Sequence, residues 1–437
     1  MGQKIASYFQ FEALGTSYKK EMLAGLTTFI SMVYILFVNP NVLSVSGMDK
    51  GAVFTATALA SAFGCFLMGI VARYPIAISA SLGINAFFSY TVVLGMKIPW
   101  QTALAGVFVA SILFMILTAF KIREMVVDAI PRDLKMAISA GIGLFIAFIG
   151  LSDGGLVSAN KSTIVALGSL HVGSTWLTIL GLILTIILMS AKVPGAIFIG
   201  MVINVIVGLA TGLIQAPDHW VAGVPSISST FGVAFTHVGS INTLQLGVVV
   251  LTFLLVTFFD TTGTLVGLTE QAGLVKDNKI PRIGRALSAD STTMVVGSLL
   301  GTSPMGAFVE SSAGIAVGGH SGFTAVVVGV LFLLGSFFSP LLTVITSQVT
   351  APALIIVGTL MAQSLKNIHW EKFEIAAPAF LILVGMPLTY SISDGIALGF
   401  ITYPLSMIAA KRGKEVSPIM YGLAVVFVIF LWILQQG

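Results

Sequence analysis

Residues 301–319 read GTSPMGAFVESSAGIAVGG, and this stretch decides the fold. It is apolar and rich in small residues, yet it carries a carboxylate, Glu310, with no lysine or arginine near it in the sequence. A charge without a partner in such surroundings costs several kcal/mol or changes its protonation state. Pro304 and the clustered glycines also interrupt the hydrogen-bond ladder of a helix. The stretch therefore predicts an extended segment followed by a half-helix, with Glu310 held there for a purpose.

A second stretch of the same character, YPIAISASLGINAFFSY at 74–90, occupies the corresponding place in the first half of the chain. The halves are matched by two further likenesses: residues 26–40 resemble 251–261, and residues 102–114 resemble 324–338. Seven predicted crossings separate the copies, so the repeats are expected to be inverted in the membrane, as in secondary transporters. Close helix packing by small residues is the alternative explanation for both stretches.

Composition places the whole chain in a membrane. Of its 437 residues 57% are hydrophobic and 9% are charged, whereas soluble domains carry roughly 25% charged residues. Apolar windows long enough to cross a bilayer recur from end to end. The runs are continuously apolar rather than alternating, which argues against a β-barrel. We therefore predict an all-α polytopic membrane protein with about 14 transmembrane segments in two inverted repeats of seven.

Basic residues mark alternate connections, beginning with Lys19 and Lys20 before the first span. By the positive-inside rule the N-terminus is expected to be cytoplasmic, in a multi-pass protein of the cell inner membrane. The sequence leaves open whether 417–434 is a separate crossing or whether two short segments after residue 372 form one broken crossing. The single cysteine, Cys65, is expected to be a buried structural thiol.

Four carboxylates lie within or beside apolar segments: Asp260, Asp290, Glu310 and Asp394. At mid-membrane a carboxylate can take up a proton near neutral pH, and it can accept two N–H donors from a flat heterocycle. We expect these roles of Asp260 and Glu310, and structural roles of Asp290 and Asp394 as helix caps or packing contacts. The alternatives are hydrogen bonding of Asp260 by its neighbouring threonines and a simple N-cap role for Glu310.

Sequence motifs of enzymes and of ATP-driven pumps are absent, with no P-loop, no HExxH and no metal-spaced set of Cys and His. We therefore expect no catalytic residues, no metal site and no cofactor, and the basic loops do not indicate nucleic-acid binding. Repeats with broken helices and buried acids favour a carrier over a channel. An anion transporter of the same fold would need a cation where the half-helices meet, and this sequence has an acid there.

The blocks FFDTTGTLVGLTEQAGL (258–274), KIPRIGRAL (279–287) and FVESSAGIAVGGHSGFTAVVVG (308–329) resemble the AzgA-like purine permeases of the nucleobase–cation symporter family. The likeness is greatest to bacterial guanine/hypoxanthine permeases. It extends to GLTTFISMVYILFVNPNVLS (25–44) and to most of the chain.

The resemblance implies proton-coupled import of a nucleobase, moved by a core domain that slides against a gate domain. After a cytoplasmic N-terminus at 1–19, the core would comprise 20–130 and 242–349, and the gate 131–241 and 350–437. The partners would be the base, the proton and the lipid bilayer. Related folds often pair as homodimers through the gate, and the sequence does not test this.

The family's substrate-binding carboxylate matches Glu310, and its D-x-x-G-T pattern places Asp260 and Thr264 at the site. Relatives that carry uracil have a histidine tied to protonation where this chain has Thr264, so Asp260 or Glu310 is expected to carry the proton. The further substrate contacts expected are backbone N–H groups at Leu82, Gly83 and Ser311 and stacking rings at Phe87 and Phe308. Asn85 is expected to be structural.

Two departures from the family pattern lie in the extended strands. Ser79-Ala80-Ser81 replaces the usual Ala-Pro-Gly, and Pro304-Met305-Gly306-Ala307 replaces a run rich in threonine and serine. These changes leave the preferred base open among guanine, hypoxanthine, adenine, xanthine and uracil. Coupling to protons or to sodium is also left open.

Overall fold

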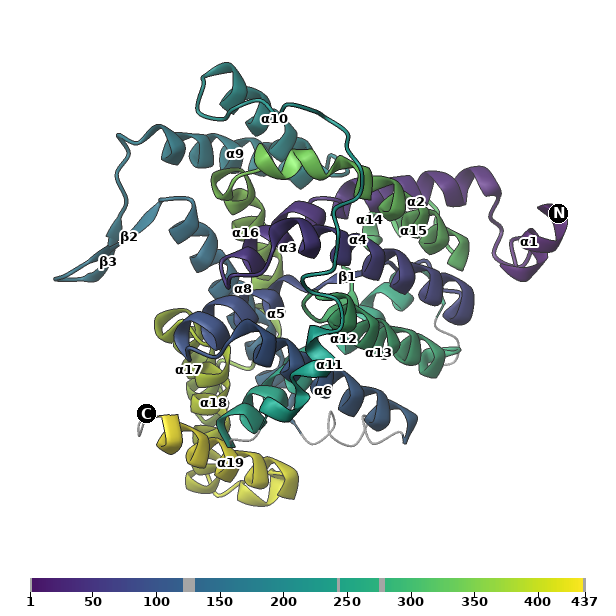
Figure 1. Ribbon diagram of the computed structural model, residues 1–437. Helices are drawn as coiled ribbons and strands as arrows, with labels where there is room; N and C mark the ends of the chain where they lie inside the picture. Colours follow the sequence, from purple (N-terminus) through teal and green to yellow (C-terminus); the bar gives the residue numbers. More distant parts are fainter. Residues whose placement is uncertain (1, 121–129, 242–243, 275–279, 435–437) are drawn as a thin grey trace.

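The computed structural model describes residues 2–120, 130–241, 244–274 and 280–434, and these are mainly helical (Figure 1). Within this part of the chain, eight helices are long and apolar enough to cross a membrane, and further apolar helices are shorter. The prediction of an all-α polytopic membrane protein is confirmed. The prediction of a buried thiol is also confirmed, because Cys65 is fully buried.

The elements of the first half, in chain order, are α1 (Gly2–Tyr8), α2 (Tyr18–Met32), α3 (Ile35–Ser44), α4 (Lys50–Leu67), η1 (Met68–Ala72), β1 (Ile78–Ala80), α5 (Leu82–Ala86), η2 (Phe87–Gly95), α6 (Trp100–Ala119), α8 (Arg132–Asp153), β2 (Val157–Asn160), β3 (Ile164–Leu167), α9 (Gly173–Ser190), α10 (Ala196–Ala210), α11 (Val233–Thr236) and η3 (Val238–Ser240).

The elements of the second half are α12 (Leu244–Gln271), α13 (Ile283–Leu300), β4 (Met305–Ala307), α14 (Ser311–Ala316), α15 (Gly322–Gly335), η4 (Ser336–Thr343), α16 (Ser347–Met361), η5 (Ala362–Asn367), α17 (Phe373–Thr389), α18 (Ile392–Ala409), η6 (Gly413–Glu415) and α19 (Pro418–Leu434).

The packing of the helices repeats between the two halves. Helix α4 packs against α15, and α6 packs against α13 in the same way. Helices α8 and α16 pack against each other, with α9 lying on α16 as α17 lies on α8. Each of these helices thus meets a partner in the other half of the chain, as two interlocked repeats require. Helix α19 packs on α18 outside this pattern, so 417–434 forms a helix of its own.

Two short strands cross where the repeats meet. Strand β1 pairs antiparallel with β4, with Ile78 opposite Ala307 and Ala80 opposite Met305. The pairing is extended by hydrogen bonds from Ser81 N to Pro304 O at 3.0 Å and from Phe308 N to Ala77 O at 2.9 Å. Both strands are buried, and at membrane depth their backbone groups have to pair within the protein. The two broken helices predicted from the sequence are therefore confirmed.

An amide network holds these strands in place. Asn39 Nδ2 donates to Thr57 Oγ1 at 2.7 Å and to Thr302 Oγ1 at 2.8 Å. Asn85 Nδ2 donates to Asn39 Oδ1 at 2.9 Å, and Ser303 Oγ donates to the same oxygen at 3.1 Å. All five side chains are buried. The network ties α3, α4, α5 and the segment before β4 together.

We call α2–α6 with α12–α15, β1 and β4 the strand group, and α8–α10 with α16–α18 the flanking group.

A buried acid braces the strand group. Glu21 of α2 accepts from the N–H of His320 and Ser321 at 3.1 and 3.2 Å and from Thr324 Oγ1 at 2.5 Å. Its charge thus lies at the N-terminus of α15, where the helix dipole favours an anion. Glu21 was not among the acids predicted within the spans.

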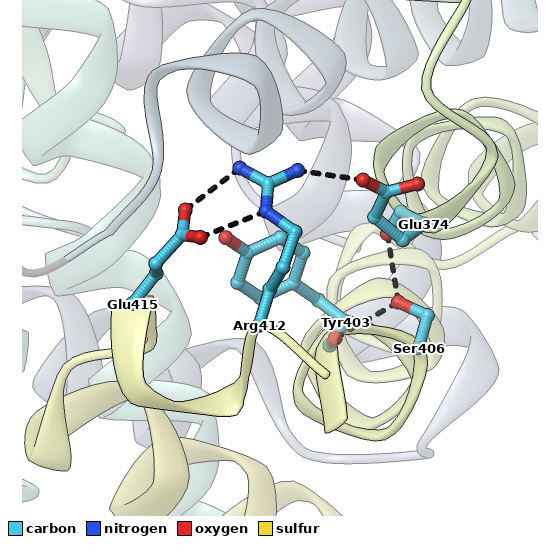
Figure 2. A network of polar contacts seen from close by, with 5 residues as sticks. All are labelled: Glu374, Tyr403, Ser406, Arg412 and Glu415. Atoms are coloured by element: carbon cyan, nitrogen blue, oxygen red, sulfur yellow. Dashed lines mark hydrogen bonds and ion pairs between the residues drawn. The ribbon is translucent and has the colours of Figure 1, made fainter. Parts of the chain in front are cut away.

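In the flanking group, Arg412 ties the ends of three helical segments together (Figure 2). Its guanidinium donates to Glu374 Oε1 at 2.6 Å and to both carboxylate oxygens of Glu415 at 2.8 and 2.7 Å. Nearby, Pro378 has no N–H to offer the carbonyl of Glu374, four residues earlier in α17. Ser406 Oγ of α18 donates to that carbonyl at 2.7 Å, which satisfies it (Figure 2).

The connection between α8 and α9 contains a hairpin. Strands β2 and β3 pair in antiparallel register, and the hairpin projects away from the helices (Figure 1). Asn160 makes its turn, because Oδ1 accepts from Ser162 N at 2.8 Å and Thr163 N at 3.1 Å.

Candidate functional site

A cavity of about 230 Å³ lies between the strand group and the flanking group, where both half-helices begin. The strand group contributes Tyr34, Ser81, Leu82, Gly83, Ile84, Val256, Thr264, Gly306, Ala307, Phe308, Val309 and Glu310. The flanking group contributes Ser139, Ile142, Val357, Leu360, Met361 and Ser364. The cavity therefore has one wall with an acid and several polar groups and a second wall that is mainly apolar.

Glu310 lies at this cavity as the residue before α14, and its side chain makes no cap hydrogen bond to that helix. Its Oε1 accepts a hydrogen bond from Tyr34 Oη at 2.5 Å. Tyr34 is fully buried and lies at the break between α2 and α3. The tyrosine therefore fixes the carboxylate toward the cavity, and the N-cap alternative for Glu310 has no support in this geometry.

Backbone donors face the same space from the first half-helix. Ser81 has an extended backbone, and its side chain makes no cap hydrogen bond to α5. The first N–H groups of a helix have no acceptor within it, so those of Leu82 and Gly83 can donate to a ligand. At Gly83 the strand group also packs tightly against the flanking group, because a Cβ there would lie 2.4 Å from Ile142 Cγ2.

Five of the predicted contacts line the cavity: Glu310, Thr264, Leu82, Gly83 and Phe308. Asp260 lies in α12, but its side chain is outside the described residues, so its role stays a prediction.

Two of the predicted contacts do not line the cavity. Phe87 is fully buried, with its ring 5.0 Å from that of Phe253 in an edge-on contact. The Ser311 N–H, the expected substrate contact, donates to Phe308 O at 3.0 Å, and the Ser311 hydroxyl accepts from Ala77 N at 3.0 Å. Both residues therefore make contacts inside the strand group.

The two remaining acids lie away from the cavity. Asp290 is fully buried in α13. Asp394 lies in the first turn of α18, where Ser391 Oγ accepts from its N–H at 3.2 Å. An acid in the first turn suits the helix dipole.

Sequence reasoning missed Tyr34, Ser139 and Ser364. Tyr34 stands in the apolar run SMVYILFV, which contains no glycine or proline to mark the helix break. A serine inside an apolar span usually indicates close packing, so Ser139 gave no separate signal. Ser364 lies at the end of an apolar run, two residues before Lys366.

At the C-terminal end of α8, the strand group and the flanking group are joined by hydrogen bonds. Tyr90 Oη donates to Asp153 Oδ2 at 2.6 Å, and Thr91 Oγ1 donates to Tyr390 O at 2.9 Å. The Tyr390 ring also contacts the rings of Tyr90 and Phe145, with centroids 5.8 and 5.6 Å away. We call these contacts the latch.

Comparison with known proteins decides the family. Residues 19–398 match the model Xan_ur_permease, described as a permease family. The chain belongs to this family of nucleobase permeases. Relatives at this level are permeases rather than enzymes, and the family resemblance stated from the sequence is confirmed.

Among its relatives, the guanine/hypoxanthine permease PbuG of Bacillus subtilis (strain 168) is 54% identical, over 99% of this chain and 100% of the relative. The adenine permease AdeP of Escherichia coli (strain K12) is 41% identical, over 96% of this chain and 94% of the relative. Among solved structures, the transmembrane domain of the cyanobacterial bicarbonate transporter BicA aligns with a TM-score of 0.62 at 15% identity. That alignment covers 87% of this chain and 96% of the other, and it shows a shared fold of two inverted repeats.

Proposed function

We propose that this permease is a proton-coupled importer of purine nucleobases in the bacterial cytoplasmic membrane. The observation that carries the proposal is the Glu310 carboxylate, oriented by Tyr34 into a cavity at the meeting point of two half-helices. A volume of about 230 Å³ suits a small planar ligand, far smaller than a nucleotide.

The geometry suits a purine held edge-on. Glu310 accepts the ring N–H and amino groups of the base, because a carboxylate offers two acceptor oxygens. The N–H groups of Leu82 and Gly83 donate to ring nitrogens or carbonyl oxygens. Phe308 supplies a ring on which the flat base stacks. Asp260, one helix away in α12, stays the second proposed acid.

Transport follows from the division of the molecule into two groups. We assign the strand group as the core, which carries the ligand, and the flanking group as the gate. The base is carried when the core slides against the gate, and a proton taken up by Glu310 or Asp260 drives import. The N-terminus is assigned to the cytoplasm by the positive-inside rule.

The relatives support the substrate class. PbuG is a guanine/hypoxanthine permease and AdeP is an adenine permease, and this chain aligns with nearly all of both. An anion transporter is the alternative from the shared fold of BicA, but that likeness is 15% identical and concerns the fold alone. Among the described residues that line the cavity there is an acid and no cation, which disfavours an anionic substrate.

Uptake of radiolabelled hypoxanthine by a permease-deficient strain that expresses the chain tests the proposal. We expect uptake above the empty-vector level that collapses with a proton uncoupler and is insensitive to replacement of sodium. Glu310→Gln should lower it at least a hundredfold, whereas Asp394→Asn should lower it less than threefold. Uptake that survives the uncoupler and depends on sodium would contradict proton coupling. Full activity of Glu310→Gln would remove Glu310 from the site.

A further inference from the structure

The gate wall of the cavity is apolar except for two hydroxyl groups. Among the described residues, the polar side chains on this wall are Ser139 of α8 and Ser364 of η5. They lie side by side, with Ser364 Oγ donating to Ser139 Oγ at 3.3 Å. Their neighbours on the wall are Ile142, Val357, Leu360 and Met361. An isolated pair of hydroxyls in an apolar wall that faces a ligand is well placed to recognise one polar group of that ligand.

The proton of Ser139 is available for this purpose. Serines and threonines inside the helices of this chain commonly donate to the carbonyl four residues earlier, as Ser111 does to Val107 and Thr359 to Ile355. In the described part of the chain Ser139 makes no such bond and only accepts from Ser364. Because a hydroxyl has one donor and two acceptor sites, Ser139 keeps its own proton for an acceptor in the cavity.

The opposite wall determines which group of the base would meet that proton. We place the ring N–H at position 1 of an oxopurine against Glu310, because a carboxylate accepts hydrogen bonds. The 6-oxo group is adjacent to that ring N–H and is a hydrogen-bond acceptor. In a 6-aminopurine the same place carries an amino group, which is a donor, so Ser139 can accept from it only by turning its own proton away from the base.

We propose that Ser139, oriented by Ser364, donates to the 6-oxo group of the base and makes the permease selective for 6-oxopurines over 6-aminopurines. This inference rests on the proposed function, since it assigns a specificity to the same cavity. Ser139 contacts the substrate directly, and Ser364 is a positioning residue. The selectivity would be set by the gate wall, while Glu310 of the core accepts the hydrogen bonds that all substrates donate.

The test is direct binding of hypoxanthine, guanine and adenine to the purified protein in lipid nanodiscs. The variants are Ser139→Ala, Ser364→Ala and the control Thr359→Ala, whose hydroxyl lies on the exposed side of α16, the helix before η5, and outside the cavity. Loss of one neutral hydrogen bond should raise the Kd of both 6-oxopurines about three- to tenfold in Ser139→Ala. The Kd of adenine should change less than twofold. Ser364→Ala should shift the 6-oxopurines in the same direction by a smaller factor, and the control should match the wild type.

Two results would overturn the inference while the proposed function stands: an equal change of Kd for all three bases, or no change for any. A wild-type protein that binds none of the three bases would overturn the proposed function and this inference with it. The same melting temperature in all variants would show that the changes in Kd do not come from unfolding.

Discussion

The two ends of the seam between the strand group and the flanking group are built differently. At the end where α8 finishes, Tyr90 and Thr91 join the groups by hydrogen bonds of 2.6 and 2.9 Å, and aromatic rings pack around them. At the end where α8 begins, the groups part around the cavity, and Val309 on its rim is 53% exposed. One end of the seam is therefore latched and the other is open to a ligand.

In the transport cycle proposed above, this difference assigns the structure to one step. Helix α8 runs from Arg132 to Asp153, so the latch lies near its last turn and Ser139 lies two turns from its start. In the orientation we propose, the latch closes the outer side and the cavity faces the cytoplasm. The conformer is then the inward-facing one, and outward opening requires the latch to break.

The largest effect on uptake is expected where the strand group and the flanking group are in tight contact. A methyl group at position 83 would overlap the stiff Ile142 side chain at 2.4 Å, and overpacking of this kind costs roughly 1–3 kcal/mol. We expect Gly83→Ala to lower hypoxanthine uptake tenfold or more at equal protein level. Ile142→Ala in the same chain should restore most of the loss.

The control for this prediction is Gly422→Ala in α19, where an added Cβ has no atom within 4 Å. Uptake of that variant should equal the wild type. If Gly83→Ala transports normally, the contact between Gly83 and Ile142 does not limit the movement of the core.

The next effect concerns the latch itself. Tyr90→Phe removes the hydrogen bond to Asp153, and a bond to a carboxyl group contributes about 1.5–3 kcal/mol when the group is charged. The population of permease molecules should shift from the inward-facing conformer toward the outward-open one. A cysteine at position 309 reports it, because the native Cys65 is fully buried and gives little background.

In inverted membrane vesicles an impermeant thiol reagent should label Val309→Cys several times more slowly when Tyr90→Phe is also present. Equal labelling rates with and without Tyr90→Phe would mean that the latch does not hold the closed end. Tyr421→Phe, which loses a hydrogen bond to Gly413 O far from the seam, is the matched control.

The smallest effect is expected inside the flanking group, away from the seam. Ser406→Ala leaves the Glu374 carbonyl without the donor that replaces the missing N–H of Pro378. The free energy of unfolding should fall by about 1 kcal/mol, seen as a melting temperature a few degrees lower in detergent. Uptake should stay unchanged, and a loss of uptake would show that the gate helices do not act as a rigid unit.

The sequence was most informative where the backbone itself is unusual. Pro304 and the glycines around it predicted the broken helices, and Glu310 stood out because a charge in an apolar segment needs an explanation. The fold class followed from composition, and the inverted repeat from the likeness between the two halves of the chain. The half-helix positions Leu82 and Gly83 also line the cavity as expected.

The parts that could not be predicted depend on tertiary contacts between distant segments. Tyr34 meets Glu310 across 276 positions of sequence, and no local pattern marks that pair. Phe87 was expected to stack on the nucleobase because it is aromatic, yet its ring packs on Phe253 of another helix. Glu21 was overlooked because its partners, the N–H groups near His320, become neighbours only in the folded chain.

The most direct test of the central claim is binding of hypoxanthine to purified wild-type protein and to Glu310→Gln, measured by calorimetry in nanodiscs. The two proteins have the same shape at this position, but the amide replaces one acceptor oxygen by a donor. We predict saturable binding by the wild type and a Kd at least a hundredfold higher in Glu310→Gln, with an unchanged melting temperature. Equal affinity of the two proteins for hypoxanthine would contradict the account.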